Sequence, residues 1–118
     1  MNRRIPLQTT ERKFFRQIIE LLNPLLKLRP KELDVLAELM YKNHILRSIP
    51  LEHRWKLIFD SASRKEMRES TKQSIASFNN NIATLKKNRL ITDNGIKSHL
   101  DIPYDPKFTL TFEFIHND

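Results

Sequence analysis

The chain has 118 residues, 39% of them hydrophobic, which suffices for one buried core and predicts a single domain over 1–118. It contains no cysteine, which excludes a disulfide framework, a thiolate metal site and a cysteine nucleophile. The formal net charge of +7 favours an acidic partner: nucleic acid first, a membrane surface second and an acidic protein third.

The N-terminal segment over 1–9 is basic through Arg3 and Arg4, and we interpret it as a mobile arm rather than a DNA-binding one. The next segment predicts a helix that begins after Thr9 or Thr10 and stops before Pro24. Its broad apolar face favours a place in the core or a dimer contact over a membrane surface. Since no apolar run approaches the roughly 20 residues that span a bilayer, and none has signal-peptide length, we expect a soluble, cytoplasmic protein without a membrane partner.

Two further helices are predicted before residue 62. One begins at Pro30, runs to about Lys42 and buries four side chains: Leu33, Leu36, Leu39 and Met40. The stretch from His44 to Asp60 is long for a connection, and its apolar residues share one face. We expect a short helix there with Pro50 as its first residue, burying Leu51, Trp55, Ile58 and Phe59.

The segment from Ser63 to Ile91 predicts two helices joined by a turn. Ser63 and Glu66 match a capping box, so the first helix is expected to start at Arg64. A break follows near Ser70 and Thr71. The second helix is expected to bury a stripe of Ile75, Phe78, Ile82 and Leu85.

The opposite face of that second helix is polar and carries no acidic residue. It comprises Gln73, Ala76, Ser77, Asn80, Thr84 and Lys87. The segment over 63–91 holds seven Lys or Arg residues against two Glu residues, a net charge of +5 out of the chain's +7. These residue types suit entry into a DNA major groove, although a polar, Lys-rich face is also what a solvated helix presents.

A β-hairpin is predicted at the C-terminal end. Phe108, Leu110, Phe112 and Phe114 alternate with Thr109, Thr111 and Glu113, which is the pattern of a half-buried strand. Its expected partner is the stretch 96–102, after a turn signal at Asp93, Asn94 and Gly95, and the stretch 103–106 would connect the two strands. The hairpin tip offers only Lys97 and Lys107 as clear cations.

The order of these elements resembles the helix-turn-helix of winged-helix proteins. The resemblance rests on Ile82, Leu85, Lys86, Lys87, Asn88, Arg89, Leu90 and Ile91, and on Arg29 to Met40, which is similar to the helix that precedes the motif in many such regulators. The matching pieces cover about half of the chain. Two departures stand out, since the expected turn lacks glycine and the insert from His44 to Asp60 is long. Phage-encoded proteins with an FNN-like recognition helix and a Trp-containing insert are also similar.

The resemblance implies a mainly α fold with a C-terminal β-hairpin: a winged helix-turn-helix with an extra N-terminal helix and an inserted short helix. Its parts would be an arm over 1–9, N-terminal helices over 10–62, the helix-turn-helix over 63–89 and a wing over 90–116. It implies binding of double-stranded DNA by a transcriptional regulator, with base contacts from Gln73, Ser77 and Asn80. Phosphate contacts would come from Arg64, Lys65, Lys72, Thr84, Lys86, Lys87 and Arg89.

Two other classes of function were weighed against DNA binding. An enzyme is disfavoured, because the four histidines lack metal-ligand spacing and a single glycine excludes a glycine-rich phosphate loop. Neither a metal nor another cofactor is expected. The second class is a structural or assembly subunit, for example of a phage virion or connector, in which the same fold makes protein contacts with itself or with another subunit.

Overall fold

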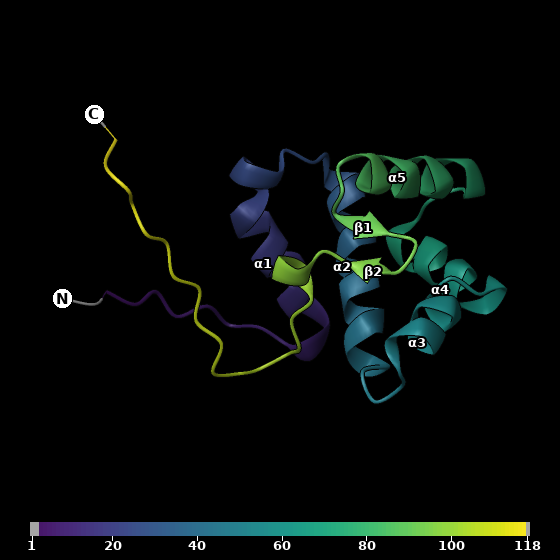
Figure 1. The fold of residues 1–118 in the computed structure, drawn as a ribbon, viewed down its shortest axis with the longest axis horizontal. Coiled ribbons are helices and arrows are strands. Elements are labelled where there is room, and N and C mark those ends of the chain that lie inside the picture. Colours follow the sequence, from purple (N-terminus) through teal and green to yellow (C-terminus); the bar gives the residue numbers. More distant parts are fainter. Residues whose placement is uncertain (1–2, 118) are drawn as a thin grey trace.

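The computed structural model describes residues 3–117, which form a helical bundle with a small antiparallel sheet near the C-terminal end (Figure 1). In chain order the elements are α1 (Glu11–Leu26), α2 (Pro30–Ile45), α3 (Leu51–Ile58), α4 (Ser61–Thr71), α5 (Ile75–Lys87), β1 (Ile91–Thr92), β2 (Gly95–Ile96) and the 3-10 helix η1 (Ser98–Leu100). Helix α2 lies at the centre and contacts the other four helices. The predicted mainly helical fold with a hairpin after the helices is therefore confirmed.

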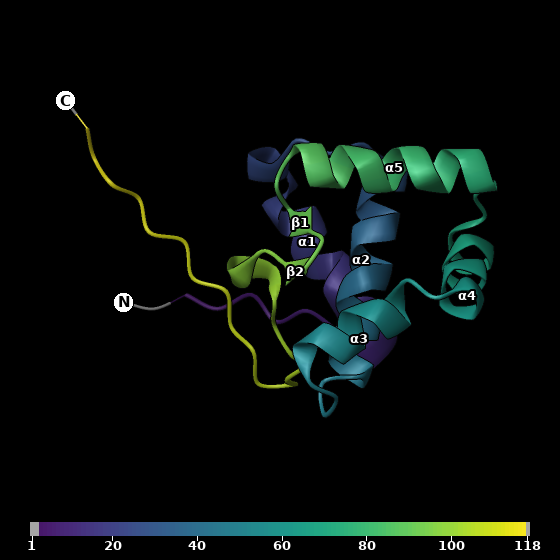
Figure 2. The ribbon, with the colours of Figure 1, turned by 45° about the vertical axis from the view of Figure 1, so that its right-hand side comes forward.

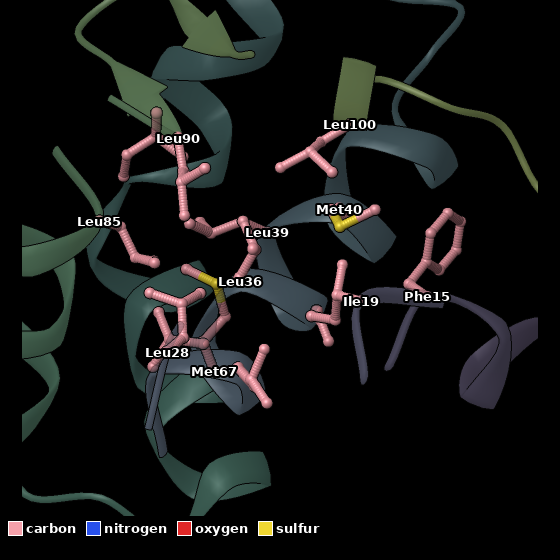
Figure 3. Packing of buried hydrophobic residues seen from close by; sticks show 14 of the residues in the cluster. Phe15, Ile19, Leu28, Leu36, Leu39, Met40, Met67, Leu85, Leu90 and Leu100 are labelled. Carbon is pink, nitrogen blue, oxygen red and sulfur yellow. The ribbon is translucent and has the colours of Figure 1, made fainter. Parts of the chain in front are cut away.

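The buried apolar side chains form one cluster that spans Phe14 to Leu100 in the sequence. Helix α2 supplies the middle of this cluster, where Leu36 and Leu39 are fully buried between α1, α4 and α5 (Figure 3). All four residues predicted to be buried by this helix are buried, as its period of 3.6 residues requires. The inserted helix α3 also packs on the cluster through Trp55 and Ile58, with Pro50 as its N-cap rather than its first residue. Phe59 is only partly buried, and Leu51, which was expected on the buried face, is 45% exposed at the start of the helix.

Helix α1 continues past Pro24, so the predicted stop before this proline is wrong. Proline cannot donate to the carbonyl of Glu20, but that residue is exposed and water can satisfy the carbonyl. The Asn23 side chain then fixes the helix end, since its amide donates to the Leu28 carbonyl at 3.0 Å and its oxygen accepts from the Leu28 N–H at 2.9 Å. The helix therefore gains one more turn, which carries the exposed Leu25.

Helix α4 begins at Ser61, earlier than the predicted start at Arg64. The N-cap is Asp60, whose carboxylate accepts a hydrogen bond from the Ser63 N–H at 2.8 Å. The predicted Ser63 capping box is therefore wrong, and Glu66 instead forms an ion pair with Lys42 on α2. The earlier start places Ser63 on the buried face, one turn before Met67.

Helix α5 buries Phe78, Ile82 and Leu85, as predicted, but Ile75 is 62% exposed. Ile75 is the first residue of the helix, and this end of α5 projects beyond α2 (Figure 2). The stripe is thus continuous in sequence, although its first position has no core beneath it. The N-cap is Ser74, whose hydroxyl accepts from the Ser77 N–H at 3.1 Å.

The hairpin is much shorter than the one predicted over 90–116. Strands β1 and β2 have two residues each, pair as Ile91 with Ile96 and Thr92 with Gly95, and are joined by the predicted turn at Asp93 and Asn94. Helix η1 occupies part of the stretch 96–102 that was expected to be a strand. The predicted strand from Phe108 to Phe114 is wrong as well, because no strand within residues 3–117 lies beside it.

A polar network explains why the chain turns away from the hairpin after η1. The buried Arg54 guanidinium donates to Asn43 Oδ1 at 3.0 Å and to the carbonyls of Ile49 and Arg47, each at 3.1 Å. Asn43 and Arg47 in turn bind the Asp101 carboxylate at 2.7 and 2.8 Å. Asp101 is thereby fixed to the end of α2, and the following residues run across α1 rather than back along β2 (Figure 1).

Candidate nucleic-acid interface

The surface of α5 that points away from the core is free of acidic residues. In fact the chain carries no Asp or Glu from Lys72 to Thr92. Ala76, Asn80, Ala83 and Lys87 lie opposite the buried stripe and are all exposed. The two alanines leave the helix backbone open to close approach, so Asn80 and Lys87 are the side chains that an incoming partner would meet first.

The turn between α4 and α5 consists of Lys72, Gln73 and Ser74. Lys72 has φ 56° and ψ 48°, the left-handed conformation in which helix ends most often place glycine. A lysine thus adopts the geometry that the missing glycine would supply, at the cost of some backbone strain.

Gln73 belongs to this turn and not to the exposed face of α5, where it was predicted. Its amide donates to the Lys31 carbonyl at 3.2 Å, and its oxygen accepts from the Asn81 amide at 2.7 Å. Both ends of the side chain therefore hold the turn against α2 and α5. The sequence signal that places Gln73 outside the helix is the capping serine at position 74.

Ser77 and Asn80, the other two predicted base-contacting residues, are exposed on α5. The Asn80 side chain makes no hydrogen bond with any part of the chain that the structure describes. Thr84 differs, since it is only partly exposed and its hydroxyl donates to the Asn80 carbonyl at 3.1 Å. Ser77 and Asn80 are consequently the uncharged polar side chains of α5 that are free, within residues 3–117, to bind a partner.

The predicted phosphate-contacting cations fall into two groups. Three already interact with neighbours: Lys86 pairs with Asp93 at 3.0 Å, Lys65 lies 4.0 Å from Glu69, and Arg64 stacks over the Phe59 ring at 5.6 Å. The other three are Lys72, Lys87 and Arg89, which are exposed and form no ion pair within residues 3–117. They lie at the two ends of α5, so each end of the acid-free face has an uncompensated positive charge.

A cleft of about 770 Å³ runs along the flank of α5 that faces α3. Its lining combines apolar side chains with charges of both signs: Leu51, Trp55, Phe59 and Ile82 are apolar, Arg64 and Lys86 are cations, and Glu52 and Asp93 are carboxylates. Lys56 also lines this cleft, a cation that sequence reasoning missed because the inserted helix was considered only for packing. The Trp55 indole N–H donates to the Thr92 carbonyl at 3.1 Å and so fixes α3 to the hairpin.

Residues 3–117 were also searched for a metal site and for a membrane span. No group of three or more His, Asp or Glu side chains there is placed to hold a metal ion. No helix in that range combines the length and the apolar character that a membrane span requires. Comparison of the chain with protein-family models, curated proteins and solved structures finds no match.

Proposed function

We propose that this chain is a winged-helix DNA-binding protein, a transcriptional regulator that places α5 in the major groove of duplex DNA. The observation that carries the proposal is the acid-free outer face of α5, with unpaired cations at both of its ends. A phosphate backbone carries one negative charge per roughly 1.7 Å of duplex axis and therefore attracts such a face while it repels acidic ones.

The element order supports this type of fold. Helix α4, a turn over 72–74 and helix α5 give the helix-turn-helix order, with a connection of the usual length. Helix α2 corresponds to the helix that precedes this motif in winged-helix proteins, and α1 and α3 are the additions. The wing would be reduced to β1 and β2, so little DNA contact is expected from it.

Base recognition in this proposal centres on Asn80. An asparagine side chain can pair with adenine through two hydrogen bonds. Its NH₂ group donates to N7, and its oxygen accepts from the N6 amino group. Ser77 lies one turn earlier on α5 and is also exposed. Gln73 is left out of the base-contacting set, because its amide already holds the turn.

Phosphate binding is proposed for Lys72, Lys87 and Arg89, whose charges are uncompensated. Lys86 would bind a phosphate only after leaving Asp93, and Arg64 only after leaving Asn79. The exposed start of α5 adds the backbone N–H groups of residues 75 and 76, which favour an anion there, whereas the Ser77 N–H is already bound by the Ser74 hydroxyl.

A direct test is fluorescence anisotropy with a short random-sequence duplex at low salt, alongside the same strand unpaired and an acidic polypeptide. Preference for the duplex supports groove binding. Equal binding to all three polyanions would mean that the protein recognises only negative charge, and it would contradict the proposal. If no duplex binding occurs, a role as an assembly subunit becomes the better account. That role is favoured by the apolar side chains that α1 and the C-terminal residues expose, among them Leu25, Phe112 and Phe114.

A further inference from the structure

The residues over 107–115, here called the C-terminal arm, contact the core at Phe108 and then extend into solvent. Phe108 packs edge-on against Phe14 of α1 with ring centroids 5.4 Å apart. By alternation, Leu110, Phe112 and Phe114 follow on the same side of an extended chain. Their exposed fractions rise from 36% to 55% to 96%. A row of apolar side chains therefore begins at the core and becomes steadily less covered by the rest of residues 3–117.

The backbone of the arm is hydrogen-bonded only at its start, where the N–H groups of Lys107 and Phe108 donate to Asp105. From Thr109 to Ile115, no backbone group forms a hydrogen bond to the part of the chain that the structure describes, and no regular secondary structure is present. In both views the arm extends away from the body on the side of α1 (Figures 1 and 2). A segment with strand-like alternation, free backbone groups and a bare apolar face is ready to pair with another strand.

The charges of the arm identify a suitable partner. The arm contains one cation, Lys107, and one anion, Glu113, both on the face opposite the phenylalanines. When two copies of the arm run antiparallel with Leu110 opposite Leu110, each Lys107 stands across from the partner's Glu113. The same register sets Thr109 across from Thr111 and Phe108 across from Phe112, which are favourable cross-strand pairs.

We propose that the C-terminal arm forms an antiparallel two-stranded ribbon with the arm of a second copy, centred on Leu110, and so makes the protein a symmetric dimer. The pairing is self-complementary, so the two copies are related by a two-fold axis. A duplex-binding role for the arm is not favoured, because its net charge is zero.

The apolar surface is large enough for such an interface. A two-stranded ribbon alone is marginally stable and needs a surface to pack on. Helix α1, which the arm contacts through Phe108 and Phe14, exposes Leu21 to 48% and Leu25 to 75%. The exposed apolar side chains of the arm and these leucines together offer roughly 700 Å² per copy, or about 1,400 Å² per dimer, within the range of stable interfaces. The inference holds whether or not α5 binds DNA.

The first test uses single cysteines, which are informative because the chain has none of its own. In the proposed register the two copies of residue 110 face each other within disulfide reach, while the two copies of residue 114 lie roughly 25 Å apart along the ribbon. Mild oxidation of full-length Leu110→Cys should therefore give a covalent dimer, and Phe114→Cys should remain monomeric. Failure of Leu110→Cys to cross-link, or equal cross-linking of both variants, would overturn the proposal.

The second test exchanges the two charges of the arm. Lys107→Glu and Glu113→Lys each place like charges across from one another twice per dimer, which should weaken dimerisation roughly tenfold in sedimentation equilibrium. The double variant restores both pairs and should recover the affinity of the original chain. If the double variant is as weak as the single ones, the register is wrong. If all four proteins are monomers at high concentration, the dimer itself is refuted.

Discussion

The α5 surface and the C-terminal arm leave different kinds of group uncovered. On the outer face of α5 the exposed groups are small or polar, and cations at its ends lack acidic partners. On the arm the exposed groups are phenylalanine, leucine and isoleucine, with one charge of each sign. The first surface suits a polyanion, whose binding depends on salt, and the second suits an apolar strand, whose binding depends on buried area. One chain can therefore serve two partners without competition between them.

The largest expected effect separates the two faces of α5. Phe78→Ala removes a fully buried ring and should lower the free energy of unfolding by about 3 to 5 kcal/mol in urea titrations. Ile75→Ala, on the exposed first turn, should change it by less than about 0.5 kcal/mol. Comparable losses for the two variants would mean that the first turn of α5 is packed after all.

A smaller loss is expected in DNA affinity when the outer face alone is altered. Asn80→Ala should cost about 1 to 3 kcal/mol at a preferred site and relax the preference at one base pair. Selection from a random duplex pool, followed by affinity measurements, would determine both quantities. Gln73→Ala serves as the matched control, since it should lower stability through the turn and leave the base preference unchanged. A preference that follows Gln73 and ignores Asn80 would refute the proposed contacts.

The start of α4 gives an effect of intermediate size. Asp60→Ala removes the N-cap and should cost about 1 kcal/mol of stability. Ser63→Ala should be neutral or stabilising, because its buried hydroxyl has no hydrogen-bond partner within residues 3–117. Thermal unfolding of both variants would decide between the two caps, and a larger loss from Ser63→Ala would restore the capping box.

The smallest expected effect concerns the arm. Ending the chain after Thr109 should change the stability of the monomer by less than about 0.5 kcal/mol, because the residues removed contribute no buried core side chain. Measured at rising protein concentration, the unfolding temperature of the full chain should increase, whereas that of the shortened chain should stay constant. A large loss at low concentration would show that the arm folds onto its own body.

The sequence predicted the elements whose pattern depends on their own core contacts. Helices α2 and α5 were located from their buried stripes, and Trp55 located α3. Helix boundaries were less accurate, because Asp60 and Ser63 compete as caps and only the packing of Met67 selects between them. The end of α1 was predicted too early at Pro24 for a similar reason, because the Asn23 side chain supports one more turn through its two hydrogen bonds with Leu28.

The arm and Gln73 show why the remaining features could not be predicted. Alternation from Phe108 to Phe114 describes the side chains of a strand, but it does not say which strand lies beside it, and among the residues that the structure describes none does. Gln73 fits an exposed helix face by type and spacing, yet its role depends on Lys31, which is distant in sequence. Ser77, Asn80 and Lys87 are exposed as expected, because the helical period of α5 determines which of its residues face outward.

The most direct measurement of the central claim is a salt titration of binding to random duplex DNA. The variant to compare is Lys87→Gln with Arg89→Gln, and the matched control is Arg3→Gln with Lys13→Gln, which removes the same charge from exposed positions on the α1 side. The account predicts that the first pair lowers the salt slope by about 2, one for each lost phosphate contact, while the control retains the slope of the original chain. Equal slopes for the two variants, or no duplex binding at low salt, would contradict the account.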